Sequence, residues 1–222
     1  MNLIRKSWLV FEKDLRQEFK TRFSINAIML FSIITLVAVS FSIGTYNASA
    51  EIKSALLWII LFFSAMSGLA HIFVREEEKH TAETLKLVTD PTSIFLGKFI
   101  FNLVLLFLLE LLIIPLFFVV LNFQVADLGI FLVILLLGDV GLAAGATIIA
   151  AIISKASAKG ALFTVLSFPI LLPVLIAGIS GTKIAVTDNT FRSVMSEVQM
   201  LFAFAVVLIT ASLLLFEFVW NE

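Results

Sequence analysis

The sequence contains no cysteine and few charged residues. The missing cysteines exclude a disulfide framework, a thiolate metal site, a covalent Cys-x-x-Cys-His haem site and a redox thiol. Charged residues make up only 14% of the 222 residues, whereas soluble domains carry about 25%. The 15 Lys and Arg residues nearly balance the 16 Asp and Glu residues, so charge gives no support for nucleic-acid binding. This composition excludes a soluble enzyme and a disordered chain.

Apolar residues, in contrast, make up 61% of the chain and fall into long runs. A helix that crosses a bilayer needs about 20 apolar residues. Six runs approach or exceed that length, and they cover residues 26–44, 54–74, 99–121, 128–153, 161–180 and 196–219. Backbone groups in lipid must pair within their own segment, so each run is predicted to be a helix. We therefore expect an all-α polytopic membrane protein in which residues 1–222 form one domain with six transmembrane helices.

The basic residues divide unequally between the two sides of these predicted spans. One side holds Arg5, Lys6, Lys13, Arg16, Lys20, Arg22, Arg75, Lys79, Lys86, Lys98, Lys155 and Lys159, and the other holds Lys53, Lys183 and Arg192. Basic residues accumulate on the cytoplasmic side of membrane proteins. This split predicts that both termini are cytoplasmic.

Residues 1–24, before the first run, have the pattern of an amphipathic helix. Apolar residues recur there every three or four positions, at Ile4, Trp8, Phe11, Leu15 and Phe19. Such a helix can lie in the membrane interface with its apolar face against the acyl chains. An ordinary charged cytoplasmic segment is the alternative.

The longest polar stretch, residues 75–98, is predicted to be a cytoplasmic loop. It contains Glu77, Glu78, Thr81, Glu83 and Leu85, and Pro91 ends its helical part. Thr81 is the candidate N-cap of a short amphipathic helix. This helix would suit docking of a soluble partner, and a merely solvated connector is the alternative.

Small residues and prolines mark the fourth and fifth runs. Gly138, Gly141 and Gly145 would let neighbouring helices approach closely, either within the chain or at a dimer seam. Pro169 and Pro173 each remove a helical donor, so we expect a kinked span, which either moves during transport or is static.

Two acidic residues, Glu110 and Asp139, fall near the middle of the third and fourth runs. Acids at that depth usually face the bundle interior and are candidates for function. No Lys or Arg lies at matching depth, so burial would favour their protonated forms. A carboxyl group that only bonds a neighbouring helix is the alternative.

The motifs of a nucleotide-binding or catalytic protein are missing. The phosphate loop G-x-x-x-x-G-K-[ST] and the zinc motif H-E-x-x-H do not occur, and no set of nucleophile and base stands out. His71 and His80, the only histidines, lie on the side away from the outer surface. We expect a subunit that is not an enzyme, holds no metal or haem itself, and relies on another polypeptide for ATP.

The chain resembles ABC-2-type permeases, and within them the haem exporter protein B (CcmB) family. The resemblance to ABC-2-type permeases rests on four features that follow one another in the loop. These are an acidic cluster, the pattern Thr-x-Glu-x-Leu, a proline and the pair Gly97-Lys98. The resemblance to the CcmB family spans essentially the whole chain. Its matching positions are Glu83, Leu85, Lys98, Gly138, Gly141, Gly160, Pro169 and Pro173. Phe168 and Glu110 depart from the family's usual pattern.

This resemblance implies a permease subunit of system-I cytochrome c maturation in the bacterial inner membrane. Its expected partners are a CcmA-like ATPase, the haem-handling subunits CcmC and CcmD, and the haem chaperone CcmE, in an oligomeric complex. ATP would bind the ATPase, and the other subunits would handle haem. The alternatives are an ABC-2 permease that exports another substrate, and a proton-coupled transporter that uses Glu110 and Asp139. The sequence shows no internal repeat, whereas many proton-coupled transporters have one, and this disfavours the second alternative.

Overall fold

The computed structural model describes residues 2–43, 48–154, 159–188 and 190–221, and within these ranges every regular element is a helix. In chain order the elements are α1 (Leu3–Thr21), α2 (Phe23–Ile43), α3 (Ala50–Leu69), α4 (His71–Glu78), α5 (Ala82–Val88), α6 (Pro91–Val120), α7 (Leu128–Ile153), α8 (Lys159–Thr187), the short 3₁₀ helix η1 (Phe191–Val194) and α9 (Met195–Asn221).

Among the described residues, six helical segments are long and apolar enough to cross a membrane. They are Phe23–Ser42, Ala50–Glu78, Pro91–Val120, Leu128–Ile153, Phe163–Thr187 and Phe191–Trp220. The predicted all-α class with six spanning helices is confirmed. α6 begins at Pro91 rather than near residue 99, because Pro91 occupies the first helical turn and the polar residues Ser93 and Lys98 are buried in the protein.

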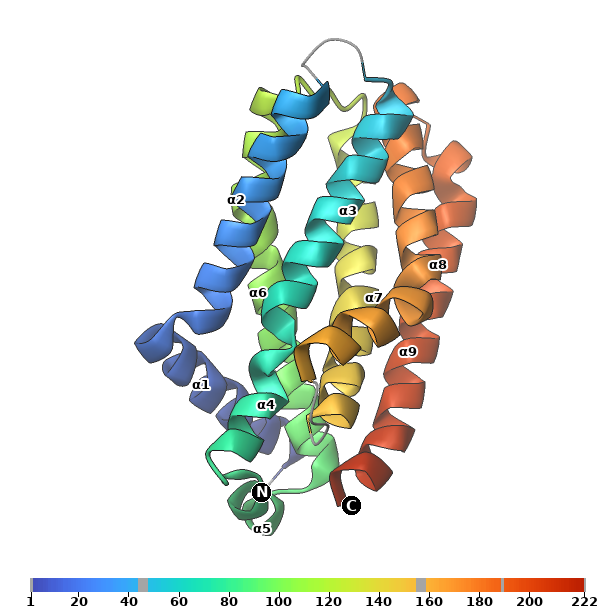
Figure 1. Cartoon of the computed structure of the whole chain (residues 1–222). Helices are drawn as coiled ribbons and strands as arrows, with labels where there is room; N and C mark the ends of the chain where they lie inside the picture. Colours follow the sequence, from blue (N-terminus) through green and yellow to red (C-terminus); the bar gives the residue numbers. More distant parts are fainter. Residues whose placement is uncertain (1, 44–47, 155–158, 189, 222) are drawn as a thin grey trace.

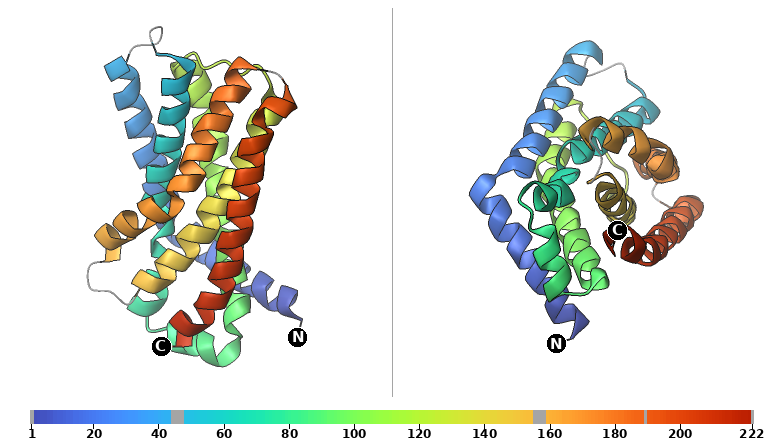
Figure 2. Two further views of the ribbon diagram at one scale, coloured as in Figure 1. Left: turned by 90° about the vertical axis from the view of Figure 1, so that its right-hand side faces the viewer. Right: turned by 60° about the horizontal axis from the view of Figure 1, so that its bottom comes forward.

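The six long helices run alongside one another, and α1 lies obliquely across the foot of the bundle (Figure 1). α5 and the first turns of α6 lie at the same end, which we call the α5 end (Figures 1 and 2). α3 and α7 bury most of their residues, whereas only 22% of the residues in the apolar stretches of α2 and α9 are buried. Because the exposed residues of these two helices are largely apolar, their outer faces suit contact with lipid.

Glycines let two neighbouring helices pack closely against α7. A Cβ atom on Gly138 would come within 2.1 Å of the Trp58 ring from α3. A Cβ atom on Gly145 would come within 2.5 Å of Leu171 from α8, and one on Gly141 would meet Val174 at 3.1 Å. The three glycines therefore contact helices of this same chain.

α8 remains helical through Pro169 and Pro173 but is not straight. Its first turns cross the bundle, and the rest of the helix runs along it (Figures 1 and 2). Proline inside a helix removes a hydrogen bond and causes such bends.

The polar stretch after α4 forms the short helix α5, which begins at Ala82 and ends at Val88. The predicted capping by Thr81 is wrong. Thr81 occupies the N-cap position, but its hydroxyl donates a hydrogen bond to Glu76 Oε2 at 2.5 Å instead. The side chain thereby ties the start of α5 to α4.

Candidate functional site

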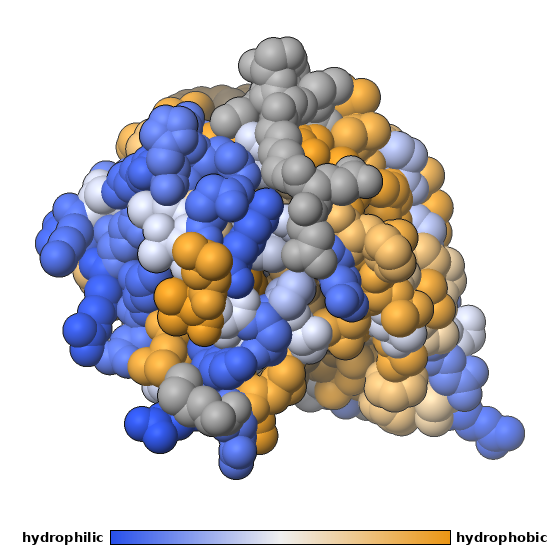
Figure 3. Space-filling model, turned by 90° about the horizontal axis from the view of Figure 1, so that it is seen from below, coloured by the Kyte–Doolittle hydropathy of each residue, from blue (hydrophilic) through white to orange (hydrophobic). Residues whose placement is uncertain are grey.

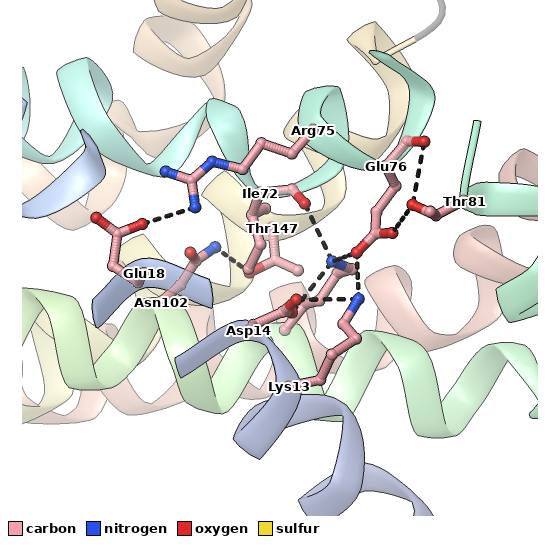
Figure 4. A network of polar contacts seen from close by, with 10 residues as sticks. Lys13, Asp14, Glu18, Ile72, Arg75, Glu76, Thr81, Asn102 and Thr147 are labelled. Atoms are coloured by element: carbon pink, nitrogen blue, oxygen red, sulfur yellow. Dashed lines mark hydrogen bonds and ion pairs between the residues drawn. The ribbon is translucent and has the colours of Figure 1, made fainter. Parts of the chain in front are cut away.

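A buried network of charged side chains joins α1, α4 and α6 at the α5 end (Figure 4). At its centre the Lys98 ammonium is fully buried and donates to Asp14 Oδ2 at 3.1 Å, the Ile72 carbonyl at 3.0 Å and Glu76 Oε1 at 3.2 Å. An ammonium has three donors, so all are used. It also lies 4.9 Å from the centre of the Phe73 ring. This arrangement compensates the cost of burying the charge.

Lys13 and Thr81 extend this network towards α5. Lys13 pairs with Glu76 and, at 3.1 Å, with Asp14. Burial by itself would lower the pKa of Lys13, but the carboxylates of Asp14 and Glu76 outweigh it and raise that pKa. Two cations, Lys13 and Lys98, thus face two anions, and Glu76 also accepts from Thr81. We call these five residues the α4 ion network.

A second buried ion pair fixes the turn between α1 and α2. The Glu18 carboxylate is fully buried, lies 2.7 Å from the Arg75 guanidinium and accepts a hydrogen bond from the Ile25 amide at 3.0 Å. Arg75 also donates to Ser24 and lies over the Phe23 ring. The start of α2 is therefore held to α4.

A third ion pair, more exposed, joins α1 to the segment after α5. Lys6 pairs with Asp90, which precedes α6 and accepts a hydrogen bond from Ser93 at 2.6 Å. The hydrogen bond from Lys6, and then that from Ser93, holds the pKa of Asp90 well below its usual value. α1 is thus linked to both ends of the α5 segment, through Glu76 and Thr81 at its start and through Asp90 after its end.

Gly97 allows α1 to lie close enough to α6 for these ion pairs to form. A Cβ atom at Gly97 would come within 2.6 Å of the Ser7 carbonyl oxygen and 2.7 Å of Val10. The Gly97-Lys98 pair at the start of the third span therefore combines a close helix contact with a buried charge.

The predicted loop residues separate into two groups. Thr81 and Leu85 turn towards α1 and line hollows between α1 and α5. Glu78 and Glu83 are exposed, Glu77 is half-buried, and Glu83 has an ion pair with Lys86 of its own helix at 3.2 Å. The acidic side chains of the loop that remain accessible therefore point outward, while Glu76 is taken up by the α4 ion network.

The two predicted intramembrane acids come together. Glu110 of α6 and Asp139 of α7 are both buried, and their carboxyl groups lie close enough to interact directly. Two turns nearer the α5 end, Asn102 donates to Thr147 at 2.9 Å across the same helix pair. The α6–α7 interface thus contains two polar pairs, and each pair joins one residue of α6 to one residue of α7.

Sequence reasoning did not identify most of the α4 ion network. Asp14 and Glu76 are not among the candidate residues of the sequence analysis, and Lys98 appears there only as a basic residue and as a position of the family pattern. The spacing of polar residues in α1 does indicate a polar face, because Ser7, Asp14 and Glu18 lie on one side of the helix. The pairing itself joins Asp14 to a residue 84 positions away, and local patterns carry no information on such a contact.

Comparison with protein families gives one match that covers most of this architecture. The family model described as CcmB protein matches residues 5–219, from within α1 to the last turns of α9. No curated protein matches the chain significantly.

Proposed function

The chain belongs to the CcmB family, and we propose that it is the membrane permease subunit of an ABC-type complex for cytochrome c maturation. CcmB proteins are permeases of an ABC system of haem export for that pathway. In the proposed complex a separate CcmA-like ATPase hydrolyses ATP. This chain couples that hydrolysis to haem handling, or to release of a haem-loaded CcmE-like chaperone, together with CcmC-like and CcmD-like subunits. The observation that carries the proposal is the family match over residues 5–219.

We assign the ATPase contact to the α5 end, on the cytoplasmic side of the inner membrane. The excess of basic residues at this end supports that orientation. α5 exposes Leu87 and Val88 at 88% and 75%, and its Glu83 side chain is 80% exposed. Seen from below, this end is largely hydrophilic around an apolar island (Figure 3). Exposed apolar groups in such surroundings are typical of a protein interface.

The polar contacts supply a route by which docking at α5 would reach the membrane helices. Thr81 at the start of α5 bonds Glu76, and Glu76 bonds Lys98 in the first turns of α6. Asp90 after α5 pairs with Lys6 of α1. A displacement of α5 would therefore act on α6 and α1 together.

We assign haem to the partner subunits and ATP to the ATPase. The His71 ring packs edge-on against Phe23, with 4.6 Å between ring centres, and His80 is exposed. Both lie at the α5 end, away from the side on which the chaperone would receive haem. The sequence also lacks the phosphate loop of an ATPase.

Substitution of the most exposed residue of α5 tests this proposal. We expect Leu87→Glu to abolish co-purification of the ATPase and the formation of c-type cytochromes, because a carboxylate would be buried in an apolar contact. Gln124→Glu, which adds the same charge at an exposed position of the opposite end, is the control and should retain both. If loss of the ATPase partner leaves c-type cytochromes unchanged, the proposed pathway is wrong and export of another substrate becomes the better hypothesis.

A further inference from the structure

Two buried acids, Glu110 of α6 and Asp139 of α7, have no part in the proposed contact with the ATPase. Both lie within spanning segments, each about 15 Å along its helix from the end of the bundle opposite the α5 end. That depth is close to the middle of a hydrocarbon core about 30 Å thick. The two residues are only 8% and 2% exposed. We call them the acidic pair.

Each member of the acidic pair keeps one carboxyl oxygen without a hydrogen-bond partner. These buried atoms are Glu110 Oε1 and Asp139 Oδ2. A buried oxygen without a partner costs free energy, so the pair has binding capacity that the surrounding side chains do not fill. No group of three or more His, Asp or Glu side chains that could hold a metal occurs among the described residues. A proton needs only one carboxyl oxygen and fits this site.

Among the described residues, no cation compensates the acidic pair. Each of its carboxyl groups is the only charged group that acts on the other. α2 and the rest of α7 carry no titratable residue, and those of the other long helices lie towards the helix ends, at Glu51, Lys53, Lys98, Lys159, Lys183, Glu197 and Glu217. Those of α1, α4 and α5 lie at the foot of the bundle (Figure 1). Two carboxylates without a counter-ion cannot both stay ionised in an apolar interior, so the pair holds at least one proton.

The polar side chains of the α6–α7 interface lie on one side of the acidic pair. Towards the α5 end they include Thr147 and its partner Asn102, whose Oδ1 has no hydrogen-bond partner either. Lys98 follows one turn beyond Asn102. Towards the opposite end, residues 111–120 of α6 and 128–138 of α7 contain only apolar residues, glycine and one proline. Because protons cross a membrane protein along polar groups, this asymmetry directs exchange to the α5 end.

We propose that the acidic pair is a proton-binding site within the membrane, which exchanges its proton with the aqueous phase at the α5 end. Loss of the proton places a second negative charge at a buried interface, so the protonation state of the pair acts on the packing of α6 against α7. The site goes beyond the proposed function, since it requires neither the ATPase nor haem.

An apolar carbodiimide tests whether the acidic pair holds a proton. N,N′-dicyclohexylcarbodiimide enters membranes and reacts with protonated carboxyl groups. The acid proton passes to a nitrogen of the reagent, the carboxylate oxygen bonds its central carbon, and the acyl group then migrates to nitrogen, so the adduct contains every atom of both reactants. We expect mass spectrometry of the full-length protein, labelled in its membrane near neutral pH, to place the adduct at Glu110 or Asp139. Glu217→Gln, which removes an exposed acid of α9, is the control and should keep this adduct.

Infrared spectroscopy gives a second measurement that needs no access for a reagent. We expect wild type to show the carbonyl band of a buried carboxylic acid, and Glu110→Gln with Asp139→Asn to lose it, because neither amide carries an acid proton. A folded wild-type protein with neither the adduct nor the band overturns the proposal. If the double variant does not fold, the position of the adduct in wild type decides.

Proteoliposomes with a different pH on each side test the direction of exchange. Protease access to α5 establishes which side the α5 end faces. We expect the labelling rate to fall when the pH is raised on that side, because deprotonation removes the reactive form, and to ignore the pH of the other side. A rate that follows the other side, or neither, overturns the assigned exchange.

Discussion

At the scale of single residues, Lys98 is the position where a substitution should be most costly. Its fully buried ammonium neutralises Asp14 and Glu76. We expect Lys98→Met to destabilise the protein by about 3–5 kcal/mol, because two buried carboxylates lose a partner. Thermal unfolding in detergent measures the loss. Lys79→Met, at an exposed lysine, should stay within about 0.5 kcal/mol of wild type. Equal melting of the two variants would contradict the role of the α4 ion network in stability.

The buried pair of Glu110 and Asp139 should affect coupled activity rather than membrane insertion. Glu110→Gln and Asp139→Asn keep the size of each side chain and its ability to hydrogen-bond, but neither amide can release a proton. We therefore expect each variant to insert normally and to lower the yield of c-type cytochromes. Membrane fractionation checks insertion and haem staining checks yield. An unchanged yield in both variants would leave the pair with a packing role only.

At the scale of helices, close packing of α3 against α7 depends on Gly138. We expect Gly138→Ala to destabilise the protein by about 1–3 kcal/mol, because the added methyl group would overlap the buried Trp58 ring, which a hydrogen bond to Thr182 holds in place. Gly129→Ala is the control, since its Cβ atom would meet only the Asp127 side chain at 3.2 Å. A helix should tolerate or prefer that change. Thermal unfolding of both variants distinguishes a specific contact from a general preference against alanine.

The amphipathic α1 illustrates what a helical pattern can and cannot predict. Its helical structure follows the predicted spacing, and three of the apolar residues, Ile4, Trp8 and Phe19, are exposed as an interfacial helix requires. Phe11 instead packs into the protein, together with Asp14. The position of α1 in the membrane interface stays a prediction. The pattern could not show that Asp14 and Glu18 are turned inward, because Lys98 of α6 and Arg75 of α4, which pair with them, are distant in the sequence.

At the scale of the whole molecule, the proposed coupling depends on an exposed residue that the fold does not need. Glu83 is accessible and pairs only with Lys86 of the same short helix among the described ion pairs. We expect Glu83→Ala to leave folding unchanged, because such a surface pair contributes less than about 1 kcal/mol. By weakening docking, however, it should uncouple ATP hydrolysis from cytochrome c maturation. Normal assembly and turnover in this variant would remove the loop from the mechanism.

The sequence by itself determined the class of the molecule and its six spanning helices. It could do so because span length depends only on bilayer thickness and on apolar residues that are neighbours in the chain. Only the tertiary structure decided which charges are buried and paired. Lys98 meets Asp14 and Glu76 because α1 folds back across the foot of the bundle and Gly97 lets it approach α6.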